Sequence, residues 1–142
     1  MDKLINKIKE LITSEEIKKG KLLSFLNLTD VTLLYIWKRG ESLPSTSNYI
    51  KLAEYFNCSL DFLVNRTLSD DKKYKYDEKK FYHNLRELMR IKNKTRYQMV
   101  YKDMICPSAS FVKWKRGSIP TIETLIKLAD YFSVSVDELL SV

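Results

Sequence analysis

The stretch "WKRGSIPTIETLIKLADYFSVSVDELL" (114–140) contains the clearest structural signals in this 142-residue chain. Gly117 can end one helix in a left-handed conformation, and Thr121 stands where the N-cap of the next helix is expected. Apolar residues then recur at the three- and four-residue spacing that gives a helix one buried face: Leu125, Leu128, Ala129 and Phe132. Ser135 is placed to cap a final short helix (136–139). The stretch therefore predicts the end of one helix followed by two more.

The same pattern occurs twice in the chain. "WKRG" stands at 37–40 and again at 114–117. Beyond it, "LPSTSNYIKLAEYFNCSLDFLV" (43–64) lies on "IPTIETLIKLADYFSVSVDELL" (119–140), with shared "IKLA" and "YF". A self-similarity of this length indicates a duplicated domain.

The duplication defines the expected domain boundaries. Upstream of WKRG, the apolar spacing of 4–12 also matches that of 81–89. We therefore predict one domain over 1–65 and a second over 81–142. Between them, 66–80 is almost continuously polar and charged, which predicts an exposed linker.

Each copy is expected to form five short helices and no strand. The chain has only three glycines and no sustained alternation of apolar and polar residues, so the fold class is all-α. In the second copy, Thr95 with Gln98 forms a capping-box pattern. The helices expected there cover 82–92, 95–104, 107–116, 122–132 and 136–139.

Charge favours an anionic partner such as nucleic acid. Twenty-five Lys and Arg residues against eighteen Asp and Glu give a net charge of +7, and 81–142 alone carries ten basic and six acidic groups. Two cysteines and the single His83 exclude a disulfide framework and a Cys/His zinc site, and they indicate a reduced, cytoplasmic protein.

Catalysis and membrane insertion are not indicated. The sequence offers no nucleophile-base set, paired carboxylates, metal-ligand cluster or phosphate loop, so we expect no catalytic or metal site. It has no run of 18 apolar residues and no apolar signal core at its start, so we expect neither membrane insertion nor export.

Five short helices, a tight turn between the second and third, and the run 114–140 resemble the phage-repressor helix-turn-helix family (Cro/CI, also called XRE-type). The resemblance covers 4–65 and 81–141. It implies two tandem five-helix domains of the lambda-repressor-like type, whose third helix lies in the DNA major groove. It further implies a sequence-specific double-stranded DNA-binding transcription regulator that needs no cofactor, a repressor of phage or mobile-element type.

The resemblance assigns three roles in the second copy. Phe111 and Trp114 match buried positions of the third helix. The base-facing positions are Ser108, Ala109 and Lys113. The phosphate-facing positions are Thr95, Arg96, Lys115 and Arg116. Serine and lysine can bond base edges and an alanine methyl suits thymine, whereas phosphate contacts set the register.

The second copy departs from the family in three respects. The turn at 104–106 has no glycine, and Arg96 stands where the family has glutamine. The segment from the second to the third helix is also one residue longer than the family pattern.

The first copy has an unusually apolar third helix, "TDVTLLYIWKRG" (29–40). Its base-facing positions are Asp30 and Thr32, and its phosphate-facing positions are Lys38 and Arg39. Leu34 and Trp37 fill the core positions. The other apolar residues are Val31, Leu33, Tyr35 and Ile36. We interpret this surplus as a protein contact, either between the copies or between chains of a homodimer.

The apolar helix also supports an alternative function. The same fold can serve as a protein-interaction module, such as an antirepressor, an antitoxin or a phage-encoded inhibitor of a defence nuclease. The steep salt dependence expected of a DNA reader distinguishes the two functions.

Overall fold

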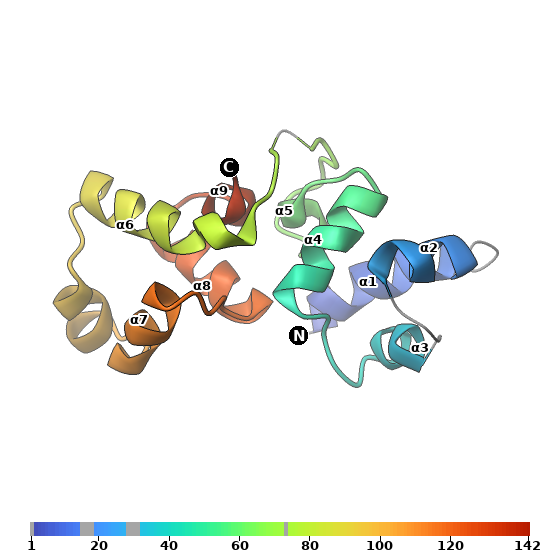
Figure 1. The fold of residues 1–142 in the computed structure, drawn as a ribbon, viewed down its shortest axis with the longest axis horizontal. Coiled ribbons are helices and arrows are strands. Elements are labelled where there is room, and N and C mark those ends of the chain that lie inside the picture. Colours follow the sequence, from blue (N-terminus) through green and yellow to red (C-terminus); the bar gives the residue numbers. More distant parts are fainter. Residues whose placement is uncertain (1, 15–18, 28–31, 73) are drawn as a thin grey trace. The chain divides into compact units, whose positions relative to one another are not determined.

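The computed structural model describes residues 2–14, 19–27, 32–72 and 74–142. The chain divides into two compact units, Met1–Lys73 and Tyr74–Val142, which we call unit 1 and unit 2 (Figure 1). Across the described residues the regular elements are helices, with one isolated antiparallel bridge. The all-α prediction is therefore confirmed for this part of the chain. No helix found there has the length and apolar character needed to cross a membrane.

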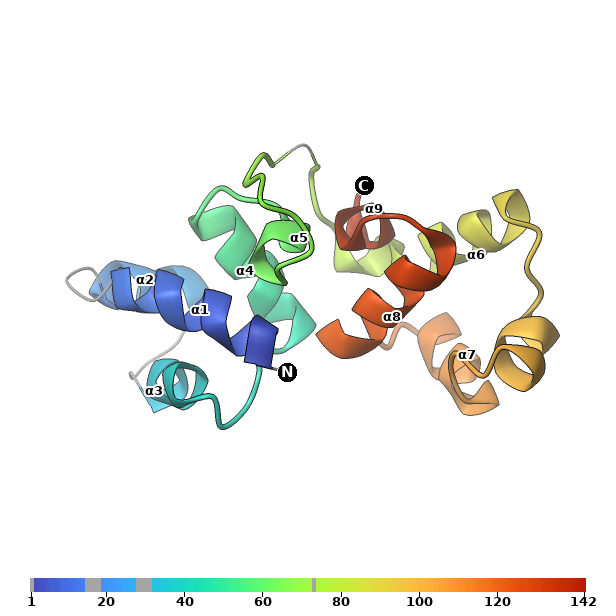
Figure 2. The ribbon, with the colours of Figure 1, turned by 180° about the vertical axis from the view of Figure 1, so that it is seen from behind.

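Unit 1 is built from short helices that pack through their apolar faces. They are α1 (Asp2–Ser14), α2 (Lys19–Leu26), α3 (Thr32–Arg39), α4 (Thr46–Tyr55) and α5 (Leu60–Leu63). Helix α1 packs on α3 and α5, and α4 packs on α2 and α5 (Figure 2). The core includes Ile8, Ile12, Leu34, Trp37, Tyr49 and Leu52.

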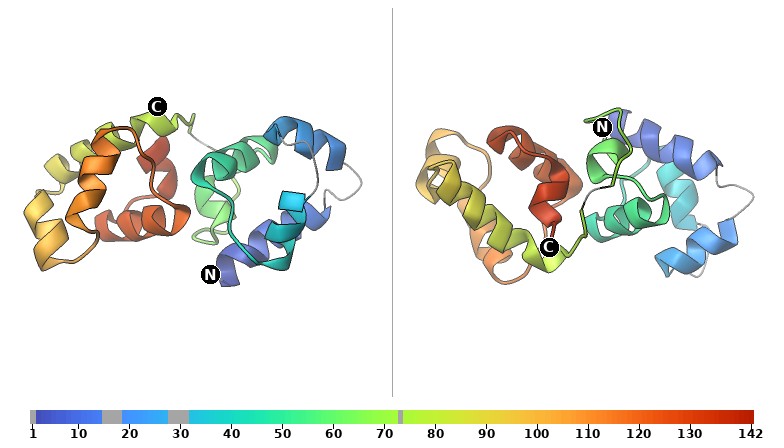
Figure 3. Two further views of the ribbon diagram at one scale, coloured as in Figure 1. Left: turned by 60° about the horizontal axis from the view of Figure 1, so that its bottom comes forward. Right: turned by 90° about the horizontal axis from the view of Figure 1, so that it is seen from above.

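Unit 2 repeats this order of helices behind a short 3-10 turn. Its elements are η2 (Glu78–Lys80), α6 (Phe81–Ile91), η3 (Gln98–Lys102), α7 (Ser108–Lys115), α8 (Ile122–Phe132) and α9 (Val136–Leu140). In Figure 3, as in Figures 1 and 2, the gold helix η3 lies beside α7. Both η3 and α7 lie away from α9 in these views. The core includes Phe81, Leu85, Phe111, Leu125, Leu128 and Leu139.

The predicted caps of unit 2 are confirmed. The Thr121 hydroxyl accepts the N–H of Thr124, and Ser135 accepts the N–H of Glu138, so each satisfies a free donor at a helix start. Gly117 takes the expected positive φ, 104°. Unit 1 has the same caps 76 residues earlier, since Ser45 and Ser59 accept from the third residue beyond them.

In each unit, a residue ahead of the third helix has a positive φ. Asn27 in unit 1 and Met104 in unit 2, 77 positions apart, both have positive φ, 61° and 51°. Asparagine tolerates this left-handed region, whereas methionine is strained in it. Met104 therefore occupies the turn in which the resemblance leads us to expect glycine.

Helix η3 explains why the segment from the second to the third helix of unit 2 is one residue longer than the family pattern. It is a π-helix, in which the Asp103 N–H donates to the Gln98 carbonyl 2.8 Å away. A turn closed between residues i and i+5 holds one residue more than an α turn. The predicted α-helix over 95–104 is thus replaced by a shorter helix that ends in a π turn.

Replacing Met104 by glycine should raise the stability of unit 2 by about 0.5–1 kcal/mol, because the left-handed strain exceeds the entropy that glycine adds to the unfolded chain. The Met104 side chain is 75% exposed, so little packing is lost. Urea unfolding followed by Trp114 fluorescence, with Trp37 replaced by phenylalanine, measures the change. Asn27→Gly is the control, with a smaller gain expected in unit 1. A loss of stability in Met104→Gly would contradict this account.

The predicted linker is divided between the units. Arg66 forms an ion pair with Asp61 of unit 1 at 2.8 Å. By contrast, 74–80 belongs to unit 2, where Tyr76 pairs with Ser141 in the isolated bridge. The Asp77 N–H donates to the Leu140 carbonyl, and the Val142 N–H donates to the Lys75 carbonyl, both at 2.9 Å. We call 74–80 the strap.

The strap also supplies a hydrogen-bond donor to a buried carboxylate. Asp137 of α9 is only 2% exposed, and the Tyr76 hydroxyl donates to its Oδ1. Tyr74 donates more weakly to Glu138, at 3.4 Å. A buried charged group that loses a donor destabilises the fold. The charge pattern of the segment, which predicted exposure, carries no information about this pairing.

Tyr76→Phe should lower the stability of unit 2 by about 1–3 kcal/mol, because Asp137 loses a donor in a buried position. Thermal unfolding monitored by Trp114 fluorescence measures the loss. Tyr74→Phe is the matched control and should cost less, since its hydrogen bond is longer. Equal effects of the two variants would argue against a special role for the Asp137 contact.

Candidate nucleic-acid interface

Two aromatic side chains fix the orientation of helix α7. Phe111 and Trp114 are 1% and 5% exposed, and their ring centroids lie 5.4 Å apart. Trp114 also meets Phe81 of α6 edge to face, at a centroid distance of 5.4 Å. The predicted burial of both residues is confirmed. Because this side of α7 is held in the core, the opposite side faces outward.

The outward side of α7 carries one stripe of exposed residues. Their spacing of three, four and seven positions places them on one helix face. They are Ala109, Val112, Lys113 and Arg116. Ala109 and Lys113 are predicted base-facing residues, and Arg116 is a predicted phosphate-facing one. Sequence reasoning missed Val112, which is 41% exposed, although its spacing from Ala109 gives the signal.

The structure joins two residues that were predicted to have separate roles. One guanidinium nitrogen of Arg96 donates to the Ser108 carbonyl at 2.9 Å and to its hydroxyl oxygen at 3.0 Å. The Arg96 guanidinium also lies over the Phe111 ring, 5.2 Å from its centroid. Ser108 is half-buried. Arg96, at the start of the helix that precedes α7, therefore holds that helix to the first residue of α7.

The remaining predicted phosphate contacts of unit 2 are all exposed. Thr95 caps the helix before α7, its hydroxyl accepting the Gln98 N–H at 3.0 Å, as the capping-box pattern predicted. Lys115 and Arg116 stand at the C-terminal end of α7, where positive charge also complements the helix dipole.

Positive charge is concentrated in the part of unit 2 that contains α7. Nine of the ten Lys and Arg residues of 81–142 lie between positions 86 and 116, where only Glu87 and Asp103 are acidic. By contrast, 117–142 holds one lysine and four acidic residues. This uneven distribution of charge gives 86–116 a positive electrostatic potential, which attracts an anionic polymer such as nucleic acid.

The outward helix α7, with its buried Phe111 and Trp114, lies in a region that is similar to a known domain family. Residues 84–142 match the family model of the Cro/C1-type HTH DNA-binding domain. No curated protein and no solved structure matches the chain. The match supports a DNA-binding regulator and covers most of unit 2.

Within the matched region 84–142, a hydrogen bond ties the end of η3 to α8. The Tyr131 hydroxyl donates to Oδ2 of Asp103 at 2.5 Å, and the Lys94 ammonium lies 5.4 Å from the centre of the Tyr131 ring. Burial first, and then this hydrogen bond, raise the pKa of Tyr131 from 10.0 to about 12.

The raised pKa predicts a loss of stability at high pH. The unfolded chain releases the Tyr131 proton near pH 10, whereas the folded domain keeps it up to about pH 12. The stabilisation is therefore complete below pH 10 and declines as the pH rises through this window. Tyr131→Phe should make the stability of unit 2 fall less steeply with pH there, as measured by urea unfolding at successive pH values. An equally steep decline in Tyr131→Phe would contradict this account.

The corresponding helix of unit 1 is polar at only part of its outward face. Positions 77 residues before the α7 stripe hold Thr32, Tyr35, Ile36 and Arg39. Thr32 and Arg39 are exposed, and Arg39 pairs with Glu41 at 2.9 Å. Ile36 stands 77 positions before Lys113.

The other predicted residues of unit 1 are placed as follows. Lys38 and Leu33 are half-buried, as is Ile36, and Tyr35 is 38% exposed. Asp30 and Val31 lie outside the described residues. Of the residues predicted to form a protein contact, Leu33, Tyr35 and Ile36 are described by the structure, and they lie on α3.

Proposed function

We propose that this protein is a sequence-specific double-stranded DNA-binding transcription regulator, acting as a repressor of phage or mobile-element type. The observation that carries the proposal is the α7 stripe of Ala109, Val112, Lys113 and Arg116, held outward by buried Phe111 and Trp114. A helix presented in this way fits the major groove. Lysine can reach guanine acceptors, and alanine and valine methyl groups suit thymine. The family match of 84–142 supports the same function.

We also propose that units 1 and 2 are two copies of one helix-turn-helix domain. This second proposal is supported by features of unit 1 that recur in unit 2 at a constant distance of 76 or 77 residues in the sequence. These are the buried Trp37 and Trp114, the positive-φ Gly40 and Gly117, and the caps Ser45 and Thr121. Two such domains in one chain can bind adjacent half-sites, which raises the affinity through effective concentration. A regulator of this kind acts on DNA in the cytoplasm.

Selection of bound duplexes from a random pool, using the full chain, tests the proposal. We expect one enriched motif, and an affinity for it that falls steeply as salt rises, because bound phosphates release counterions. A pool without any enriched motif would refute sequence-specific binding.

A second function rests on α3. Its half-buried Leu33 and Ile36 and its exposed Tyr35 present apolar surface where α7 presents Lys113. This favours a protein contact through unit 1, either in a homodimer or with another protein, as in an antirepressor, an antitoxin or an inhibitor of a defence nuclease. Replacing Tyr35 and Ile36 together by polar residues should then reduce the mass of the assembly in solution. An unchanged mass with weaker DNA binding would instead assign α3 to DNA.

A further inference from the structure

A cleft in unit 2 lies between the C-terminal half of α6 and the loop that follows it. Its volume is about 550 Å³. The residues that line it are Arg86, Met89, Arg90, Asn93, Lys94, Thr95, Arg96 and Tyr97. This volume falls within the range of clefts that hold small molecules.

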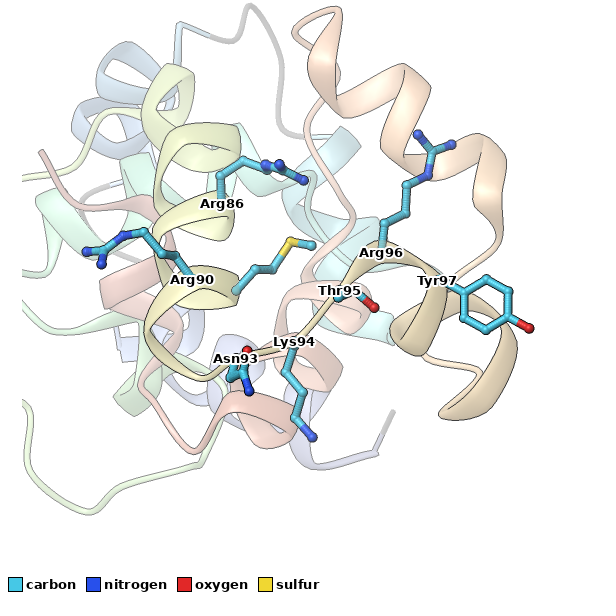
Figure 4. A pocket seen from close by; sticks show the side chains of 8 residues that line it. Arg86, Arg90, Asn93, Lys94, Thr95, Arg96 and Tyr97 are labelled. Atoms are coloured by element: carbon cyan, nitrogen blue, oxygen red, sulfur yellow. The ribbon is translucent and has the colours of Figure 1, made fainter.

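The lining is strongly cationic. It contains four basic side chains and no acidic one. Figure 4 shows Arg86 and Arg96 extending on the same side of the cleft, with Lys94 on the other side and Arg90 directed away from them. Arg90 is paired with Glu87 at 2.9 Å. Within the described part of the chain, Arg86 makes no ion pair or hydrogen bond.

Two arginine side chains on one side of a cleft whose lining has no acidic residue are suited to an oxyanion. The planar guanidinium presents parallel N–H donors that match the oxygens of a phosphate group. The Thr95 hydroxyl and the Asn93 amide add neutral polar groups to the same lining, while buried Met89 and the Tyr97 ring add apolar surface. Polar and apolar surface together suit a phosphorylated organic molecule better than a bare ion.

We propose that this cleft binds the phosphate group of a small phosphorylated molecule through Arg86 and Arg96. The same ligand competes with Ser108 for the Arg96 guanidinium, one nitrogen of which donates two hydrogen bonds to Ser108. Ser108 begins α7, so occupancy of the cleft changes the DNA-reading helix. This last step rests on the proposed DNA-binding function, whereas binding in the cleft does not.

Titration of the full chain with inorganic pyrophosphate, followed by amide NMR without DNA, tests the proposal. We expect saturable shifts at 93–97 together with a shift at Ser108. Arg86→Gln should weaken the affinity about tenfold or more, and Arg86→Lys should weaken it less because the charge is kept. Lys127→Gln, which removes an exposed charge on α8 outside the cleft, should leave the affinity unchanged.

Other outcomes overturn the proposal. If Arg86→Gln and Lys127→Gln weakened the affinity for pyrophosphate equally, binding would depend only on the net charge of the protein. Absence of binding, combined with a DNA salt slope reduced by about one in Arg86→Gln, would assign the cleft to the DNA backbone. Saturable binding with no motif in the duplex selection would keep the cleft as a phosphate site and refute only the DNA-binding function.

Discussion

Phe111→Ala should destabilise unit 2 by about 3–5 kcal/mol, the cost of removing a large aromatic side chain from a packed core. Phe111 is 1% exposed and contacts the Trp114 ring, and its ring lies beneath the Arg96 guanidinium. Its loss therefore removes both the anchor of α7 and the surface on which Arg96 rests. Denaturant unfolding followed by Trp114 fluorescence, with Trp37 replaced by phenylalanine, should show a much lower midpoint.

The equivalent change in unit 1 provides the control. Leu34 lies 77 positions before Phe111 and is also 1% exposed. Leu34→Ala should destabilise unit 1 by about 2–5 kcal/mol, as seen through Trp37 in a chain with Trp114 replaced by phenylalanine. In the chain with Trp37 replaced, it should leave the Trp114 transition in place. If either variant shifted both transitions equally, the two units would unfold as one.

Lys113→Ala and Arg116→Ala should weaken DNA binding in different ways. Lys113 lies in the middle of the exposed stripe, where it can reach a base edge, so its loss should cost about 1–3 kcal/mol on the preferred sequence and relax the preference at one position. Arg116 stands at the end of α7, so its loss should weaken binding to all duplexes alike and lower the salt slope by about one.

Binding of the selected duplex and of single-base variants, each measured over a range of salt, distinguishes the two effects. Lys127→Ala removes a charge from α8 and serves as the control for net charge alone. If Lys113→Ala reduced binding to every duplex by the same factor, Lys113 would be a phosphate contact. If Ile36→Ala in unit 1 altered the base preference instead, the reading helix would be α3.

Features that depend on near neighbours in sequence could be predicted well. The caps Thr121 and Ser135 each bond a residue three positions on, and the positive φ of Gly117 follows from its place after a helix. These features follow from local chemistry, which a single sequence contains in full. The burial of Phe111 and Trp114, by contrast, was implied by the resemblance to the helix-turn-helix family, which matches them to buried positions of the third helix.

Features that depend on distant pairing could not be predicted. The Tyr76 hydroxyl meets Asp137 across 61 positions of sequence, and nothing in a charged segment signals such a partner. Arg96 reaches Ser108 across 12 positions, which changes the environment of two predicted contact residues at once. The π turn of η3 was visible only as a segment one residue too long, because its closure is a property of the backbone rather than of a side-chain pattern.

The strap brings the two ends of unit 2 together. Tyr76 pairs with Ser141, and the Val142 N–H donates to the Lys75 carbonyl, so the residues before α6 run beside the residues after α9. Chain ends this close can be joined by a short peptide and new ends opened elsewhere. A circular permutant of unit 2 opened in the exposed turn at Met104 would keep every helix and both backbone hydrogen bonds of the strap. In such a permutant, α7 would lie near the new N-terminus and would no longer be joined directly through the backbone to η3.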